Sequence, residues 1–296
     1  MKTSSNLFWR ILQFPVTRIV LGIFVVLVAV ALVQIAMIQL GAALGVRGAP
    51  VWQLVSAILT VITAYVVYWL FVRLIEKRPL TELAFQGMPR ELGAGILFGA
   101  VLFTIVIAIL WLTGSYHITG TNALIEILPI LGLSMVSGLF EEILFRGILF
   151  RIVEESLGSW LALIISGMLF GALHIINPGA TLSSALAVAL EAGLLLAAAY
   201  MLTRRLWFAV GIHFAWNFTQ GGIFGVHVSG NDFTGLFSST MTGPEWLTGG
   251  TFGAEASVVA VVVCLAGFVL VYWQAQKRGH VMPAFWMRVK PVPAVA

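Results

Sequence analysis

Three short stretches of this sequence place polar side chains at helical spacing inside otherwise apolar sequence. In "GLFEEILFRGILF", residues 138–150, Glu142 and Arg146 stand four apart with the acid first. This is the favourable orientation for an ion pair within a helix. Glu141 lies off the face that the pair shares, because a helix advances about 100° per residue. One arginine accounts for one glutamate, so the other is a candidate for chemistry.

Two further stretches repeat the pattern. "FGALHIIN", residues 170–177, carries His174, and "LWFAVGIHFAWNF", residues 206–218, carries His213 and Asn217 on one helical face. A lone histidine in an apolar helix is usually a packed core residue, and an asparagine can simply join helices by a hydrogen bond. Three such sets within four consecutive apolar segments favour a common site instead.

These residue types together could activate a water molecule. A carboxylate in apolar surroundings is suited to accept a proton near neutral pH, and a neutral histidine can orient the same water. His213 and Asn217 offer N–H donors for an oxyanion. Alternatively, Glu141, His174 and His213 could hold Zn²⁺ with one coordination position open. The residue types leave both routes open.

Other hydrolytic chemistries lack their residues. The chain has a single aspartate, Asp232, so a two-aspartate protease is excluded. It contains neither H-E-x-x-H nor G-x-S-x-G. Ser137 has no evident base beside it. Cys264 is the single cysteine, which excludes an internal disulfide and a cysteine metal cluster.

The composition is that of a polytopic membrane protein. Of 296 residues, 60% are hydrophobic and 9% charged, and the mean hydropathy is +1.03. A soluble domain is about 25% charged. We therefore predict an all-α membrane bundle of about eight transmembrane helices. The expected spans are 19–44, 52–72, 92–113, 123–145, 159–177, 182–202, 206–227 and 255–274.

The charges agree with this topology. With both termini in the cytoplasm, the outer loops carry only Arg47, whereas nearly all other Lys and Arg fall on the inner side. The long outer loop, about 228–254, holds acidic but no basic residues. The formal charge of +4 therefore reflects membrane topology, and no nucleic-acid partner is expected.

Three regions follow from the spans. Residues 1–118 would hold three N-terminal transmembrane helices, and residues 119–228 a catalytic core of four. Residues 229–296 would hold an outer loop, the last transmembrane helix and a cytoplasmic tail.

The motifs E-E-x-x-x-R (Glu141 to Arg146), F-x-x-x-H (Phe170 to His174) and H-x-x-x-N (His213 to Asn217) resemble, in this order, those of the CAAX protease and bacteriocin-processing family. This family of intramembrane proteases includes the type II CAAX prenyl endopeptidases. The likeness covers roughly residues 120–220.

The resemblance implies roles for the motif residues. Glu141 and His174 would activate the attacking water, while His213 and Asn217 would bind the oxyanion or help to hold a metal. Glu142 and Arg146 would be a supporting pair.

The leading hypothesis is thus an intramembrane endopeptidase acting on a peptide or protein tail, for which a lipid-modified CAAX-type tail is one form. The alternatives are a non-proteolytic membrane scaffold and a proton-coupled transporter using the same Glu and His residues. The expected location is a prokaryotic plasma membrane, in contact with lipid. We expect the cavity to open toward the cytoplasm. Glu191, in the middle of a span, either hydrogen-bonds within the bundle or lines this cavity.

Overall fold

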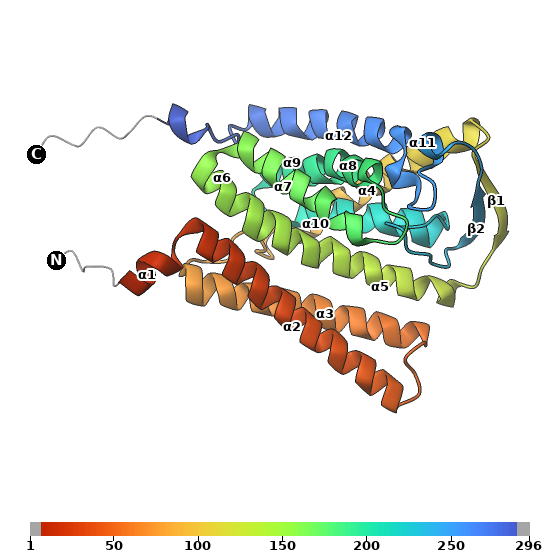
Figure 1. The fold of residues 1–296 in the computed structure, drawn as a ribbon, viewed down its shortest axis with the longest axis horizontal. Coiled ribbons are helices and arrows are strands. Elements are labelled where there is room, and N and C mark those ends of the chain that lie inside the picture. Colours follow the sequence, from red (N-terminus) through yellow and green to blue (C-terminus); the bar gives the residue numbers. More distant parts are fainter. Residues whose placement is uncertain (1–6, 289–296) are drawn as a thin grey trace, which may run out of the picture.

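A computed structural model describes residues 7–288 of the chain. Seven helices in this part are long and apolar enough to cross a membrane, which confirms the prediction of a polytopic helical bundle. Figure 1 shows α2 and α3 as a pair on one side of the bundle and α12 on the opposite side. The first half of the chain contains α1 (Leu7–Leu12), α2 (Pro15–Ala43), α3 (Pro50–Phe71), η1 (Val72–Glu76), α4 (Met88–Leu112), β1 (Tyr116–Thr121), η2 (Leu124–Ile127), α5 (Leu128–Val136), η3 (Ser137–Glu141) and η4 (Ile143–Phe150).

The second half begins with α6, which continues the helical segment of the motif glutamates. Its elements are α6 (Arg151–Leu157), α7 (Ser159–Leu173), η5 (His174–Ile176), α8 (Leu182–Val188), η6 (Ala189–Gly193), α9 (Leu194–Thr203), α10 (Trp207–Asn217), η7 (Phe218–Ile223), β2 (Phe237–Met241), α11 (Glu245–Thr248), η8 (Ala254–Ala256), α12 (Val258–Lys277) and η9 (Phe285–Met287).

The seventh expected span is shorter than the sequence predicted. In place of residues 206–227, α10 has 11 residues and η7 adds 6. Most of α10 is buried against the other helices. A hydropathy window counts the apolar loop that follows as part of the span, because it reads composition and not backbone geometry.

The helix that carries the adjacent glutamates is longer than predicted. The expected end was residue 145, but the helical segment runs over Leu124–Leu157, 34 residues, or about 50 Å. Arg151 and Glu154, which a hydropathy window reads as the end of a span, are buried and paired with charges from other segments. Their partners lie far away in the sequence, which is why the extension was not predicted.

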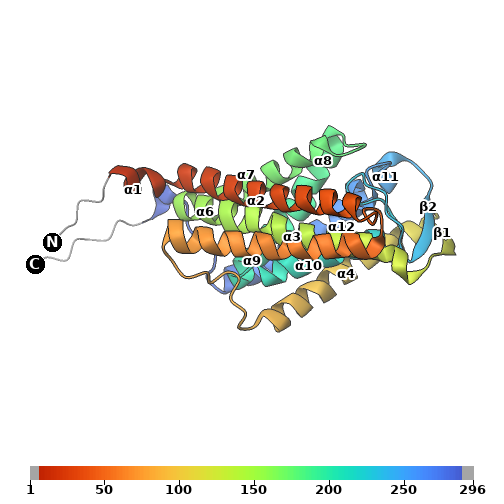
Figure 2. The same ribbon diagram turned by 90° about the horizontal axis from the view of Figure 1, so that it is seen from below.

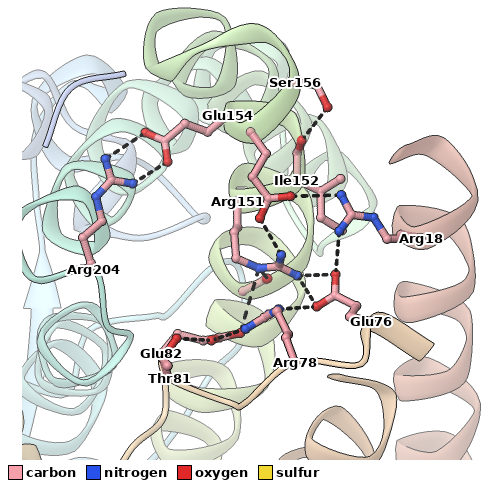
Figure 3. A network of polar contacts seen from close by, with 12 residues as sticks. Arg18, Glu76, Arg78, Thr81, Glu82, Arg151, Ile152, Glu154, Ser156 and Arg204 are labelled. Carbon is pink, nitrogen blue, oxygen red and sulfur yellow. Dashed lines mark hydrogen bonds and ion pairs between the residues drawn. The ribbon is translucent and has the colours of Figure 1, made fainter. Parts of the chain in front are cut away.

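An ionic network closes one end of the bundle (Figure 3). Arg151 Nη2 lies 2.7 Å from Glu76 Oε1, and Arg78 Nη2 lies 2.6 Å from Glu82 Oε1. Arg204 Nη1, at the end of α9, is 2.5 Å from Glu154 Oε2. Figures 1 and 2 show α1 and the end of α12 at this same end of the molecule. We call it the basic end.

A small sheet lies at the opposite end. β1 pairs antiparallel with β2, with Tyr116 opposite Met241 and an irregularity between Ile118 and Gly120. The sequence predicted a loop over 228–254, and β2 lies inside it. Both figures place the sheet away from the basic end, so the two ends of the bundle are chemically distinct.

Several helices contain π-helical turns, in which backbone hydrogen bonds skip one extra residue. These are η1, η3, η4, η6 and η7. Such turns occur often at functional sites, because they change the direction of side chains and leave backbone groups free. Three of them, η3, η4 and η6, hold Glu141, Arg146 and Glu191, which belong to the site described next.

Candidate active site

The two adjacent glutamates have different surroundings. Glu141 ends the π-helical turn η3, and Glu142 precedes the next one, η4. The side chain of Glu142 is fully buried, whereas that of Glu141 is 28% exposed. The sequence predicted that one glutamate is held by arginine and the other is left over, and this is the arrangement observed.

Arg146 holds Glu142 and also ties this helix to η6. Its Nη1 donates to Glu142 Oε1 at 2.8 Å. Its Nη2 donates to the carbonyl oxygens of Ala192 and Gly193 at 2.9 and 3.2 Å. Both carbonyls lie in the π-helical turn η6. The guanidinium carbon lies 4.7 Å from the centre of the Phe170 ring, within the range of a cation–π contact. One arginine thus positions three helices.

Glu142 orients His213 as well. His213 Nδ1 lies 2.9 Å from Glu142 Oε1. A carboxylate can only accept a hydrogen bond, so Nδ1 carries the proton and Nε2 is left for the cavity. His213 Nε2 lies 3.9 Å from Glu141 Oε2. The sequence predicted only that Glu142 pairs with Arg146. In the structure, Glu142 also orients His213.

His174 is fixed in the same manner by its own helix. It stands at the end of α7, and its Nδ1 lies 2.8 Å from the carbonyl oxygen of Phe170. A carbonyl also only accepts, so His174 Nε2 is free to take a proton. The centres of the Phe170 and His174 rings lie 4.7 Å apart. The phenylalanine of this motif therefore packs between Arg146 and His174.

Asn217 lies at the end of α10, one turn beyond His213. Its Nδ2 donates to Ser137 Oγ at 2.8 Å. An amide group has two N–H donors, so one remains for a ligand. Ser137 thus serves to hold Asn217.

The four predicted catalytic residues, Glu141, His174, His213 and Asn217, line one cavity of about 230 Å³. Glu141 lies roughly 24 Å from Leu157, and His174 roughly the same distance from Ser159 on the next helix, at 1.5 Å per residue. Glu141 and His174 therefore lie at about the same height along the bundle, because the helix that carries Glu141 extends to Leu157.

The cavity lies toward the sheet end of the molecule. Asn177, Ser229, Asn231 and Glu255 line it, and they come from the segments that follow η5, η7 and β2. The cavity therefore lies farther from the basic end than the sequence indicated, because the helix carrying Glu141 ends at Leu157 and not at residue 145. The side of the membrane to which the cavity opens stays a prediction.

The zinc route of the sequence analysis stays a prediction. Within residues 7–288, no three or more His, Cys, Asp or Glu side chains are grouped so that they could hold a metal ion as they stand. Glu142 and a backbone carbonyl accept from Nδ1 of His213 and His174, which leaves Nε2 of each ring free, as in histidines that bind metals. The candidate set Glu141, His174 and His213 would have to move closer together to bind zinc.

The sequence reasoning missed part of the cavity wall. Glu191 was left between two roles, and the structure places it in the lining together with Glu255, Ser229 and Asn231. Glu255 stands beside a long apolar segment in a chain with few charges, and this scarcity is the one signal that could have marked it.

Comparison with known proteins agrees with the motifs. Residues 122–219, about a third of the chain, match the family model described as Type II CAAX prenyl endopeptidase Rce1-like. No curated protein and no solved structure matches the chain. The matched segment contains all three motifs, which confirms the resemblance that they indicated.

Proposed function

We propose that this multi-pass membrane protein is an intramembrane endopeptidase that hydrolyses a peptide bond with a water molecule activated by Glu141 and His174. The observation that carries the proposal is the convergence of Glu141, His174, His213 and Asn217 on one cavity. The family match supports a CAAX-type intramembrane protease in general. The roles of the individual residues are our inference from geometry.

In the proposed reaction, the Glu141 carboxylate takes a proton from water while His174 Nε2 orients it. The hydroxide oxygen bonds to the carbonyl carbon of the substrate. The free N–H of Asn217, and His213 Nε2 when that ring carries a second proton, stabilise the oxyanion. The C–N bond then breaks, and the proton held by Glu141 passes to the leaving amine.

The substrate is a peptide or protein tail that reaches the cavity from the sheet end of the molecule or from the lipid beside it. A lipid-modified tail is one such substrate. We place the protein in a prokaryotic plasma membrane, with the basic end in the cytoplasm because lysine and arginine remain on that side.

The test is cleavage of quenched-fluorescent peptides, prenylated and unprenylated, by the full chain in lipid nanodiscs. Glu141→Gln should abolish cleavage without lowering the unfolding temperature, because Glu141 has no arginine or lysine partner to leave unpaired within residues 7–288. Metal chelators should leave the rate unchanged, since the proposed reaction uses no metal. Equal rates for the wild type and Glu141→Gln would overturn the proposal, and loss of activity with chelator would overturn the metal-free route.

A further inference from the structure

The cavity contains more carboxyl groups than the proposed hydrolysis uses. Three glutamates line it, Glu141, Glu191 and Glu255, while no lysine or arginine does so in the described chain. Its two histidines, His174 and His213, are each neutral or positive. Glu142 lies beneath the cavity and is neutralised by Arg146. A cavity with this excess of carboxylates favours a cationic ligand.

Glu191 has a buried carboxyl oxygen that no neighbouring group of the described bundle satisfies. It lies in the π-helical turn η6 and is 2% exposed. Its Oε2 atom is buried and has no hydrogen-bond partner in residues 7–288. A carboxylate in the middle of a transmembrane segment is costly and normally finds a partner. Because Glu191 lines the cavity, a ligand there can supply the missing donor.

Glu255 approaches the same cavity from a different part of the chain. It lies in η8, just before α12, and is 3% exposed. The backbone N–H and the Oγ of Ser229 both donate to Glu255 Oε1 at 2.7 Å. Burial raises the pKa of Glu255, although the Ser229 hydrogen bonds and the charge of His174 oppose this effect. The side chain is thus held firmly in a place where its charge is poorly solvated.

We propose that Glu191 and Glu255 form a subsite for a basic side chain, lysine or arginine, of the peptide substrate, which rests on the proposed function. A guanidinium offers five N–H donors and an ammonium three, and either can reach an oxygen that lacks a donor. The peptide brings this charge in and carries it away as product. The free protein is therefore left with a buried carboxyl oxygen of Glu191 that has no hydrogen-bond partner within residues 7–288.

The experiment uses the full chain in nanodiscs and a series of quenched-fluorescent peptides. A single arginine is moved one position at a time along the peptide, and each peptide has a twin with neutral citrulline in its place. The measured quantity is the ratio of kcat/KM for the arginine peptide to that for its twin. At one position, the wild type should show a ratio of about ten or more.

Glu191→Gln and Glu255→Gln should each bring this ratio toward one. Glu126→Gln is the matched control, because it removes a glutamate that is exposed and outside the cavity lining, and it should keep the ratio. Two variants are used so that, if one folds poorly, the other still tests the subsite. A wild-type ratio near one at every position, or a ratio unchanged in a folded Glu191→Gln or Glu255→Gln protein, would overturn the subsite.

A second measurement separates this inference from the proposed function. The Glu141→Gln chain binds the same fluorescent peptides at equilibrium, with no cleavage required. Tighter binding of the arginine peptide, lost on adding Glu191→Gln, supports the subsite even if no peptide is cleaved. Equal binding of the twins contradicts it, whatever the outcome of the cleavage assay.

Discussion

At the scale of single residues, two neighbouring glutamates acquire different properties from their position in the bundle. Glu142 lies in the interior, where Arg146 and His213 both bind one of its oxygens. Glu141 lines the cavity and is partly exposed. A carboxylate held by an arginine and a histidine is a poor proton acceptor, whereas one facing water can take a proton. This difference in environment is the reason to assign the chemistry to Glu141.

Replacing Glu142 tests its double role. Glu142→Gln should lower stability by about 3–5 kcal/mol, because Arg146 is left buried with no charged partner. It should also lower kcat by about a hundredfold or more, because His213 Nδ1 loses the acceptor that fixes its tautomer. Thermal unfolding and peptide cleavage measure the two effects separately.

The double variant Glu142→Gln with Arg146→Met is the control. It removes both charges, so much of the stability should return while activity stays low. If activity returned together with stability, Glu142 would serve only to neutralise Arg146, and its proposed action on His213 would be wrong.

At the scale of elements, the site depends on how closely the helices approach one another. α4 and α10 pack through glycines, and a Cβ built on Gly99 would lie 2.5 Å from the carbonyl oxygen of Ile212. Small residues of this kind let transmembrane helices come close together. Because Ile212 directly precedes His213, the position of α4 sets that of the histidine.

Gly99→Ala should therefore push α10 away and displace His213. We expect a loss of about 1–3 kcal/mol in stability and a fall of about tenfold to a hundredfold in kcat/KM, since a displacement of 1 Å can cost that much. Gly93→Ala is the matched control on the same helix, because nothing lies within 4 Å of its Cβ. It should be neutral or slightly stabilising. Equal effects of the two substitutions would disprove the role of close approach.

At the scale of the whole molecule, the two ends perform different tasks. The ionic network at the basic end (Figure 3) ties α2, η1, α6 and the end of α9 together. The cavity lies toward the other end, among the loops beside the sheet. We infer that the basic end stabilises the bundle and that the sheet end admits the substrate.

The network makes stability depend on pH through Glu82. Burial alone would raise its pKa, but the hydrogen bond from Arg78 and the charges of Arg78 and Arg151 outweigh burial and lower the pKa below the ordinary 4.5. A lowered pKa in the folded state stabilises the protein above the unfolded value and loses this effect as the pH falls through the folded value.

The unfolding temperature of the wild type should therefore fall on acidification below about pH 4.5. Glu82→Gln should unfold at a lower temperature at pH 7, and its unfolding temperature should depend less on pH in the acid range. Thermal scans between pH 7 and pH 3 would measure both. A variant with the same acid dependence as the wild type would show that Glu82 does not contribute.

The orientation of the molecule can be tested with single cysteines. Asn231, at the cavity, is exposed near the sheet end, and Arg90 is exposed at the start of α4. If the basic end is cytoplasmic, a membrane-impermeant maleimide should label Asn231→Cys on intact cells, and Arg90→Cys only after permeabilisation. Cys264 is buried and should give little background. The reverse pattern would mean that the cavity opens to the cytoplasm.

The sequence by itself determined the membrane-helical class and the ion pair of Glu142 with Arg146. It also supplied the set of residues that meet in the cavity. Hydropathy and helical spacing are local properties, so they can be read from neighbouring residues. The true end of the helix at Leu157 could not be predicted in this way, because the charges that permit it are matched by Glu76 and Arg204, far along the chain.

Only the tertiary structure decided which polar groups meet. His213 and Glu142 are 71 residues apart, and Glu191 and Glu255 reach one cavity from separate helices. The place of the cavity, toward the sheet end, follows from the level at which Glu141 and His174 stand beside each other. Such relations depend on how the helices pack and how long each one is, and no local pattern of residues encodes them.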